Sequence, residues 1–110
     1  MKLDYLQTAQ PGARWFRGYY RRNPQLDIAK AVAALKAAEQ TLIAHPMAGE
    51  RLDGLADVRE LKIIGTAFSL LYTVRLETVY VIDIRDQRGL RSADALRQFT
   101  RELRQRMGQG

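Results

Sequence analysis

Three consecutive segments of this sequence are largely apolar, at residues 58–65, 68–74 and 79–85, and the basic residues Arg59, Lys62 and Arg85 stand in the first and the last of them. Basic proteins of this size often bind anionic partners, such as nucleic acid, ribosomes or an acidic protein segment. The net charge of +6 and the pI of about 10.1 agree with such a partner. The same charge could serve only to keep a small protein in solution, and it does not choose the class of partner.

The sequence offers few other reactive groups. It contains no cysteine, which removes disulfides and thiol catalysis and fits a reducing compartment. The sequence also has only one histidine, so it lacks the usual ligand sets of zinc. We therefore expect neither a metal nor a cofactor. That histidine, His45, stands before Pro46 at the end of a helical segment. It could be a general base, but we favour a cap at the helix C-terminus, where positive charge is favourable.

Composition limits the class of protein. The 110 residues are enough for one domain, and the 46% hydrophobic content is enough for one core. No apolar run approaches the roughly 18 residues that span a bilayer. Asp4 stands where an export signal would be apolar. We therefore expect one domain over residues 1–110, located in the cytoplasm and without a membrane partner.

A helical hairpin is expected in the N-terminal half. Pro11 suits the first turn of a helix over residues 11–21. Asn23 and Pro24 suit the N-cap and first position of a second helix, which runs to about Ala44. Apolar residues recur in the second helix every three or four positions, at Ile28, Ala31, Val32, Leu35, Ala38 and Leu42.

The first helix carries two different faces. Four aromatic residues are spaced for core packing, namely Trp15, Phe16, Tyr19 and Tyr20. Three arginines lie on another face, which we expect to be solvated: Arg14, Arg17 and Arg21.

A small sheet should contain a short first strand at residues 2–7 and the three largely apolar segments at 58–65, 68–74 and 79–85. A period of two places Phe68, Leu70, Tyr72 and Val74 on one face, and it gives Tyr80, Ile82 and Ile84 a common face in the next strand. The more apolar face should pack on the hairpin. The opposite face should stay partly open as a docking surface, and it collects Ser69, Thr73, Arg75, Asp83 and Arg85.

Ser92 suits the N-cap of a last helix over residues 92–107, which has Arg97, Arg101 and Arg104 on one face. The expected fold is therefore α+β. It has about four strands in a mainly antiparallel sheet, packed on an N-terminal helical hairpin, plus a C-terminal helix.

Several short motifs follow the hairpin in a fixed order: Pro46-Met-Ala-Gly49, Arg59-Glu-Leu61, Tyr72-Thr-Val74, Val79-Tyr-Val-Ile82 and the basic segment Arg85-Asp-Gln-Arg88. In this order and spacing they resemble the RelE/ParE superfamily of type II toxin–antitoxin toxins, most of all its ParE-like branch. The resemblance covers about residues 1–90 and does not include the C-terminal helix.

The superfamily contains two chemistries. RelE-like members cut mRNA in the ribosome with a cluster of Lys, Arg and often Tyr that needs no metal. Lys62 and Arg85 stand where two members of that cluster would be. Ser69, however, replaces an arginine and cannot supply its guanidinium fork. The late tyrosine is missing, and the segment from Asp83 to Asp86 lacks the histidine that many relatives carry. ParE-like members lack much of the cluster and are understood as inhibitors of DNA gyrase.

The resemblance therefore implies a ParE-like toxin of the plasmid-stabilisation kind, which inhibits DNA gyrase and is neutralised by a cognate antitoxin. It also implies a homodimer or a hetero-oligomer with the antitoxin. The alternative is a RelE-like, ribosome-dependent mRNA endoribonuclease with Lys62 and Arg85 as its catalytic candidates. A nucleic-acid-binding domain of another kind is a third reading, but its usual motifs are absent.

Seven basic residues are expected to face the target or the antitoxin: Arg59, Lys62, Arg75, Arg85, Arg88, Arg97 and Arg101. Three of them have structural alternatives. Arg59 could brace the loop or pair with an acid such as Asp57 or Glu60, and Lys62 and Arg85 could be solvated or ion-paired.

Overall fold

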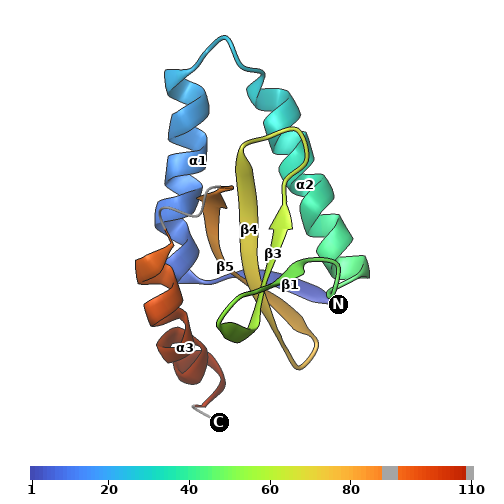
Figure 1. Cartoon of the computed structure of the whole chain (residues 1–110), viewed down its shortest axis with the longest axis vertical. Coiled ribbons are helices and arrows are strands. Elements are labelled where there is room, and N and C mark those ends of the chain that lie inside the picture. Colours follow the sequence, from blue (N-terminus) through green and yellow to red (C-terminus); the bar gives the residue numbers. More distant parts are fainter. Residues whose placement is uncertain (88–91, 109–110) are drawn as a thin grey trace.

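The computed structural model describes residues 1–87 and 92–108, and it confirms the expected α+β fold (Figure 1). In chain order the elements are β1 (Lys2–Tyr5), a 3₁₀ turn η1 (Gln7–Ala9), α1 (Gln10–Arg22), α2 (Ile28–Ala44), β2 (Glu50–Leu52), β3 (Leu55–Lys62), β4 (Phe68–Arg75), β5 (Thr78–Asp86) and α3 (Ala93–Met107). The sheet has five strands, one more than expected. The additional strand is β2, which is too short to show a period of its own.

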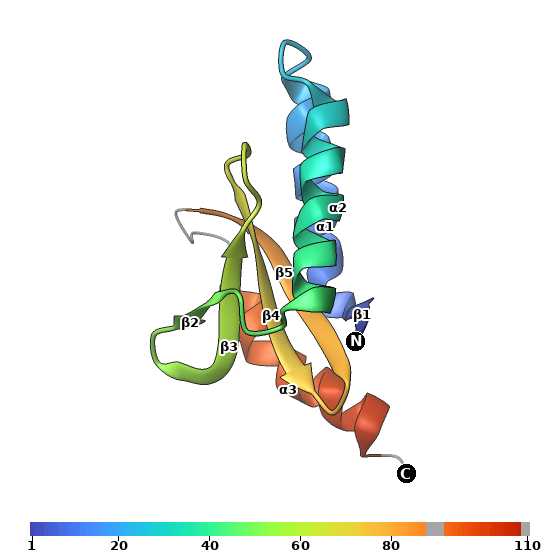
Figure 2. The same ribbon diagram turned by 90° about the vertical axis from the view of Figure 1, so that its right-hand side faces the viewer.

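The strands form one sheet in the order β1-β5-β4-β3-β2. β1 is parallel to β5, and the other neighbours are antiparallel. Short turns can connect antiparallel neighbours, whereas parallel strands need a long connection. The chain between the parallel strands β1 and β5 includes both hairpin helices. Figure 2 shows α1 and α2 on one side of the strands, with α3 beside their lower half.

Aromatic side chains fill the core between the hairpin and the sheet. The Phe68 ring is fully buried, and its centroid lies 5.0 Å from that of Trp15, 4.9 Å from that of Phe16 and 5.3 Å from that of Tyr19. All three contacts are edge-to-face, a favourable geometry for aromatic pairs. Core packing of the α1 aromatic residues is therefore confirmed. The predicted solvated face is confirmed too, because Arg14, Arg17 and Arg21 are exposed.

The second helix begins later than predicted. Its N-cap is Asp27, whose carboxylate accepts a hydrogen bond from the Lys30 N–H at 3.2 Å. Asn23 instead ends α1, because its side-chain amide donates to the Tyr19 carbonyl at 2.7 Å. The apolar stripe is only partly buried, since the side chains of Ile28 and Val32 remain exposed.

An irregularity in β5 changes which of its residues share a face. Leu71 pairs with Asp83 whereas Tyr72 pairs with Val81, so Ile82 is an extra residue in β5. Beyond such a bulge, the alternation of side chains between the two faces of the sheet is reversed. Ile84 therefore joins the core under the hairpin and Ile82 the opposite core. The predicted common face of Tyr80, Ile82 and Ile84 is wrong.

The opposite face of the sheet is not open. Ala95, Phe99 and Leu103 of α3 form a second core with Val58 and other residues of β3, β4 and β5. The polar residues that were expected to be accessible are buried: Ser69, Thr73 and Asp83. The prediction of an open docking face is therefore wrong, because the amphipathic α3 needs an apolar surface and finds it here.

Ser92 begins α3 as predicted, but its side chain does not cap the helix. Its hydroxyl donates to a carboxylate oxygen of Asp83 at 2.8 Å instead. This bond supplies a partner for Asp83, which is only 4% exposed, and a buried polar side chain requires such partners. The start of α3 is thus tied to the middle of β5.

Candidate functional site

Residues from three of the five motifs, those that begin at Pro46, Arg59 and Tyr72, converge on the loop after α2. The Tyr72 hydroxyl accepts a hydrogen bond from the Gly49 N–H at 2.9 Å and donates one to the Pro46 carbonyl at 2.7 Å. Arg59 Nη1 donates to the carbonyls of Gly49 at 2.8 Å and Met47 at 3.4 Å. Arg59 and Tyr72 are directly opposite each other in the β3–β4 ladder. We call these five residues the loop-bracing cluster.

Close packing explains the residue types in this cluster. A Cβ on Gly49 would lie 2.7 Å from both the Glu60 carbonyl oxygen and the Tyr72 hydroxyl oxygen, so a larger residue would displace the loop or the strand. Tyr72 is fully buried, and burial raises the pKa of its hydroxyl, although the Gly49 N–H and the Arg59 charge oppose the rise. The hydroxyl therefore stays protonated and can donate to the loop.

Arg59 braces the loop, which confirms one of its two predicted roles. The other role, pairing with Asp57 or Glu60, is wrong because each acid has another arginine. Asp57 pairs with Arg75 at 3.3 Å, and Glu60 pairs with Arg85 at 3.0 Å. Asp57 and Arg75 are thus neutralised as a pair between the adjacent strands β3 and β4, and Glu60 and Arg85 as a pair that reaches across β4 from β3 to β5.

The three positions that distinguish the two superfamily chemistries lie in one row across the sheet. Lys62 of β3 is opposite Ser69 of β4, and Ser69 is opposite Arg85 of β5. The Lys62 side chain is exposed, whereas Ser69 is fully buried. Among the described residues, neither Ser69 Oγ nor Arg85 Nε has a hydrogen-bond partner.

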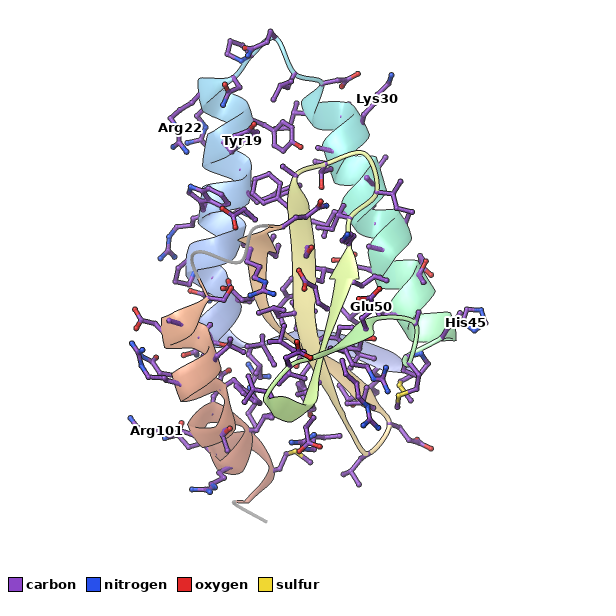
Figure 3. All side chains as sticks on the ribbon, viewed as in Figure 1. Tyr19, Arg22, Lys30, His45, Glu50 and Arg101 are labelled. Carbon is purple, nitrogen blue, oxygen red and sulfur yellow. The ribbon has the colours of Figure 1, made fainter. Side chains whose placement is uncertain are left out.

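This row offers little support for phosphodiester cleavage. Arg85 is held by the Glu60 carboxylate, and only 11% of its side chain is exposed. Ser69 supplies a hydroxyl where a guanidinium would stabilise phosphate charge. His45, the one histidine of the chain, is the C-cap of α2 and projects away from the sheet (Figure 3). Its predicted place at the helix end is confirmed, and it is not part of the row.

The remaining arginine candidates do not gather at one site. Arg75 donates to the Thr73 hydroxyl at 2.8 Å as well as to Asp57. On α3, Arg97 pairs with a neighbouring acid on the same helix, and Arg101 points into solvent (Figure 3). Arg88 lies outside the described residues.

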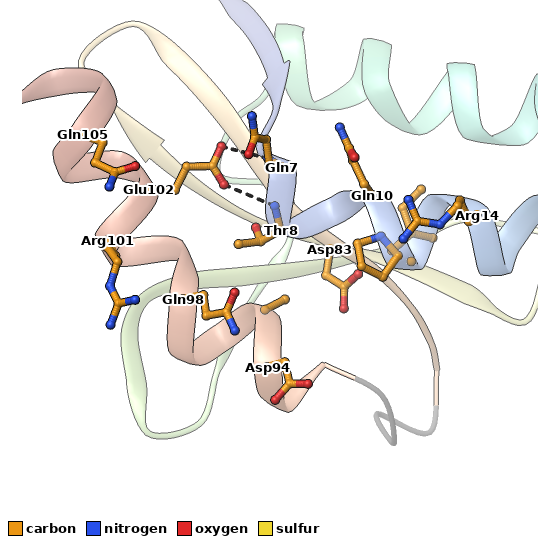
Figure 4. A pocket seen from close by; sticks show the side chains of 14 residues that line it. Gln7, Thr8, Gln10, Arg14, Asp83, Asp94, Gln98, Arg101, Glu102 and Gln105 are labelled. Atoms are coloured by element: carbon orange, nitrogen blue, oxygen red, sulfur yellow. Dashed lines mark hydrogen bonds between the residues drawn. The ribbon is translucent and has the colours of Figure 1, made fainter.

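An acidic residue of α3 that the sequence did not single out holds this helix to the N-terminus. The Glu102 carboxylate accepts hydrogen bonds from the N–H groups of Gln7 at 2.8 Å and Thr8 at 3.2 Å (Figure 4). Arg106 pairs with Glu102 at 3.0 Å and with Asp4 at 2.9 Å. The Arg106–Glu102 pair is a local i,i+4 contact of the helix, but no local pattern could reveal the contacts with Asp4, Gln7 and Thr8, because these partners lie at the other end of the chain. Beside them lies a polar cleft of about 560 Å³ between α3, η1 and α1.

A second hollow, of about 640 Å³, lies between the two hairpin helices and the sheet edge. Apolar side chains from η1, α1, α2 and β5 line most of it: Ala9, Ala13, Phe16, Val32, Leu35 and Ile84. Arg14, Arg17 and Glu39 add charge to its lining. The Glu39 carboxylate also accepts a hydrogen bond from the Tyr5 hydroxyl at 2.5 Å, which joins α2 to β1. We call this hollow the interhelical groove.

Residues 1–87 and 92–108 contain no cluster of three acidic, histidine or cysteine side chains able to hold a metal ion. In the same part of the chain, no helix combines the length and the apolar character needed to cross a membrane. No protein-family model matches the sequence, and no curated protein matches it either.

Proposed function

We propose that this chain is the toxin of a type II toxin–antitoxin pair, of the ParE-like kind, which binds DNA gyrase and is neutralised by a cognate antitoxin. The loop-bracing cluster carries the proposal. Its residues come from the motifs by which the sequence resembles the ParE-like branch, and they contact one another across a loop and two strands. The fold that the resemblance implies, a helical hairpin on a mainly antiparallel sheet, is also the fold of this chain.

The row across β3, β4 and β5 favours binding over cleavage. A ribonuclease of this superfamily needs several cations around the scissile phosphate, because they stabilise charge that develops in the transition state. Here the buried serine replaces one cation and Glu60 neutralises another. Lys62 is the one basic side chain of this row without an acidic partner in the described part of the chain.

Expression of the chain without a partner tests the target. Arrest of growth should come with altered DNA supercoiling and induction of the DNA-damage response, while protein synthesis continues at first. Prompt arrest of translation with normal supercoiling would contradict the proposal. If that arrest disappears in Lys62→Ala, the endoribonuclease alternative is the correct one. Unchanged growth would contradict an active toxin.

The antitoxin, in this proposal, docks in the interhelical groove. The sheet face that was expected to receive it is covered by α3. Most of the groove's lining is apolar, and Val32 in this lining is 41% exposed. Arg14 and Arg17 are exposed and belong to its lining. An amphipathic helix with acidic residues along its edge would match both features.

Two substitutions distinguish this docking mode from nonspecific hydrophobic association. Val32→Glu places a charge in the groove and should weaken antitoxin binding at least about tenfold, since buried unpaired charges are costly. Ile64→Glu is the matched control, because Ile64 is 86% exposed on the turn between β3 and β4. Equal binding by wild type and Val32→Glu, measured by calorimetry, would place the antitoxin elsewhere. Reversal of Arg85 is a poor test, because it would also break the partly buried pair with Glu60.

A further inference from the structure

The strands β3 and β4 separate at one end of the sheet. Their ladder reaches from Lys62 to Arg59, opposite Tyr72, and β3 then turns away toward β2 (Figure 2). Beyond that point the Thr73 hydroxyl bridges the strands by donating to the Asp57 carbonyl at 2.7 Å. A small hollow of about 190 Å³ opens there, next to the loop-bracing cluster.

Three arginines from three strands line this hollow: Arg51 of β2, Arg59 of β3 and Arg75 of β4. Asp57 is the one acidic residue in the lining. Arg51 and Arg59 are directly opposite each other in the β2–β3 ladder, a placement that is destabilising for like charges. An anion between them would remove this repulsion.

The guanidinium groups retain capacity to bind. Arg51 makes no hydrogen bond or ion pair within the described part of the chain. Arg59 contacts the loop carbonyls through Nη1 only, which fixes its position and leaves Nε and Nη2 without partners among the described residues. Arg75 is engaged by Asp57, but 69% of the Asp57 side chain is exposed, so this ion pair is weak and exchangeable.

We propose that this hollow is a binding site for a phosphate group. Guanidinium groups form paired, charge-assisted hydrogen bonds with phosphate oxygens, and three of them on different strands suit a tetrahedral anion better than a planar carboxylate. The hollow is large enough for a phosphate group, while the rest of a ligand would lie outside it. The Asp57 carboxylate pairs with Arg75 when the site is empty, and phosphate displaces it on binding. The site lies apart from the interhelical groove and does not depend on the proposed toxin function.

Titration of the whole chain with inorganic phosphate at low ionic strength tests the site, with chloride as the control anion and NMR shifts as the readout. Saturable shifts should centre on residues that line the hollow. Arg51→Ala and Arg75→Ala should each weaken binding about tenfold or more. Asp57→Asn should tighten it several-fold, because it removes the competing carboxylate. Arg21→Ala, which removes an exposed arginine of α1, should change little.

Several outcomes would overturn the site. They are the absence of saturation by phosphate, equal weakening by Arg21→Ala and Arg75→Ala, or no tightening in Asp57→Asn. The source of the phosphate follows from a second titration with single-stranded oligonucleotides that carry or lack a 5′-phosphate. Binding of both, with loss in Arg51→Ala, identifies a nucleic-acid backbone. Binding of only the phosphorylated form identifies a terminal phosphate. Each variant is checked for folding by circular dichroism, and Arg59 is left intact because it braces the loop.

Discussion

Replacement of Tyr72 by phenylalanine should destabilise the protein through one hydroxyl group. That hydroxyl accepts a hydrogen bond from the Gly49 N–H at 2.9 Å and donates one to the Pro46 carbonyl at 2.7 Å. Phenylalanine keeps the ring that packs in the core and leaves both backbone groups without this partner. Gly49 is buried, so water cannot easily replace the hydroxyl on its N–H, whereas Pro46 is partly exposed.

The expected loss is about 2 kcal/mol. Each net hydrogen bond contributes about 0.5–1.5 kcal/mol, and an unpaired buried donor costs about 1–3 kcal/mol. The partly exposed carbonyl adds the smaller share, because it can bond to water. The assay is urea unfolding followed by circular dichroism, in which the midpoint should fall while the slope m stays unchanged.

Tyr20→Phe is the matched control. Tyr20 is also a buried tyrosine in the core, at 8% exposure, but its hydroxyl makes no hydrogen bond among the described residues. Its loss should cost less than about 0.5 kcal/mol, as for substitutions that break no specific contact. If Tyr72→Phe costs no more than Tyr20→Phe, the loop-bracing cluster does not hold the loop and the reasoning is refuted.

Three further changes test other parts of the fold. Leu76→Gly should stabilise the protein by about 1 kcal/mol in the same unfolding assay, because Leu76 has a φ of 54° and its side chain is 86% exposed; a loss of stability would contradict this strain. Glu102→Gln should cost about 1–3 kcal/mol, since its charged bonds to Gln7 and Thr8 weaken; an unchanged urea midpoint would show that α3 is held by its apolar face alone. Burial, reinforced by the hydrogen bond to Glu39, raises the pKa of Tyr5 in the folded protein. The contribution of Tyr5 to the free energy of unfolding is therefore complete below the unfolded-state pKa of about 10, and it is lost as pH rises above that value. Tyr5→Phe should flatten the decline of the urea midpoint above that pH, and an equally steep decline would exclude Tyr5 as its cause.

The loop-bracing cluster shows which features of a site sequence motifs can predict and which they cannot. Pro46, Gly49, Arg59 and Tyr72 stand out in the sequence by their order, but their spacing gives no distances between them. Only the register of β3 with β4 brings Arg59 and Tyr72 to the same loop. Of the two roles predicted for Arg59, the structure selects bracing because the nearby acids are taken by other arginines.

Local signals of the sequence determined the helices and the three longer strands of this protein, often to within a few residues. Periods of two and of three to four, together with Pro11 and the Pro46 break, are properties of neighbouring residues, so they can be read directly. The start of α2 was missed because Asn23 and Asp27 both suit a cap, and only the folded chain shows which one receives the Lys30 N–H.

Tertiary structure alone decided which surface of the molecule is accessible. The bulge at Ile82 reverses the alternation in β5, and strict periodicity cannot anticipate an extra residue. α3 packs on the sheet face on which Ser69, Thr73 and Asp83 are buried, and the bonds of Glu102 that hold α3 join opposite ends of the chain. Such contacts depend on the three-dimensional path of the backbone rather than on neighbouring residues, which is why the sequence predicted the elements but not the surface they present.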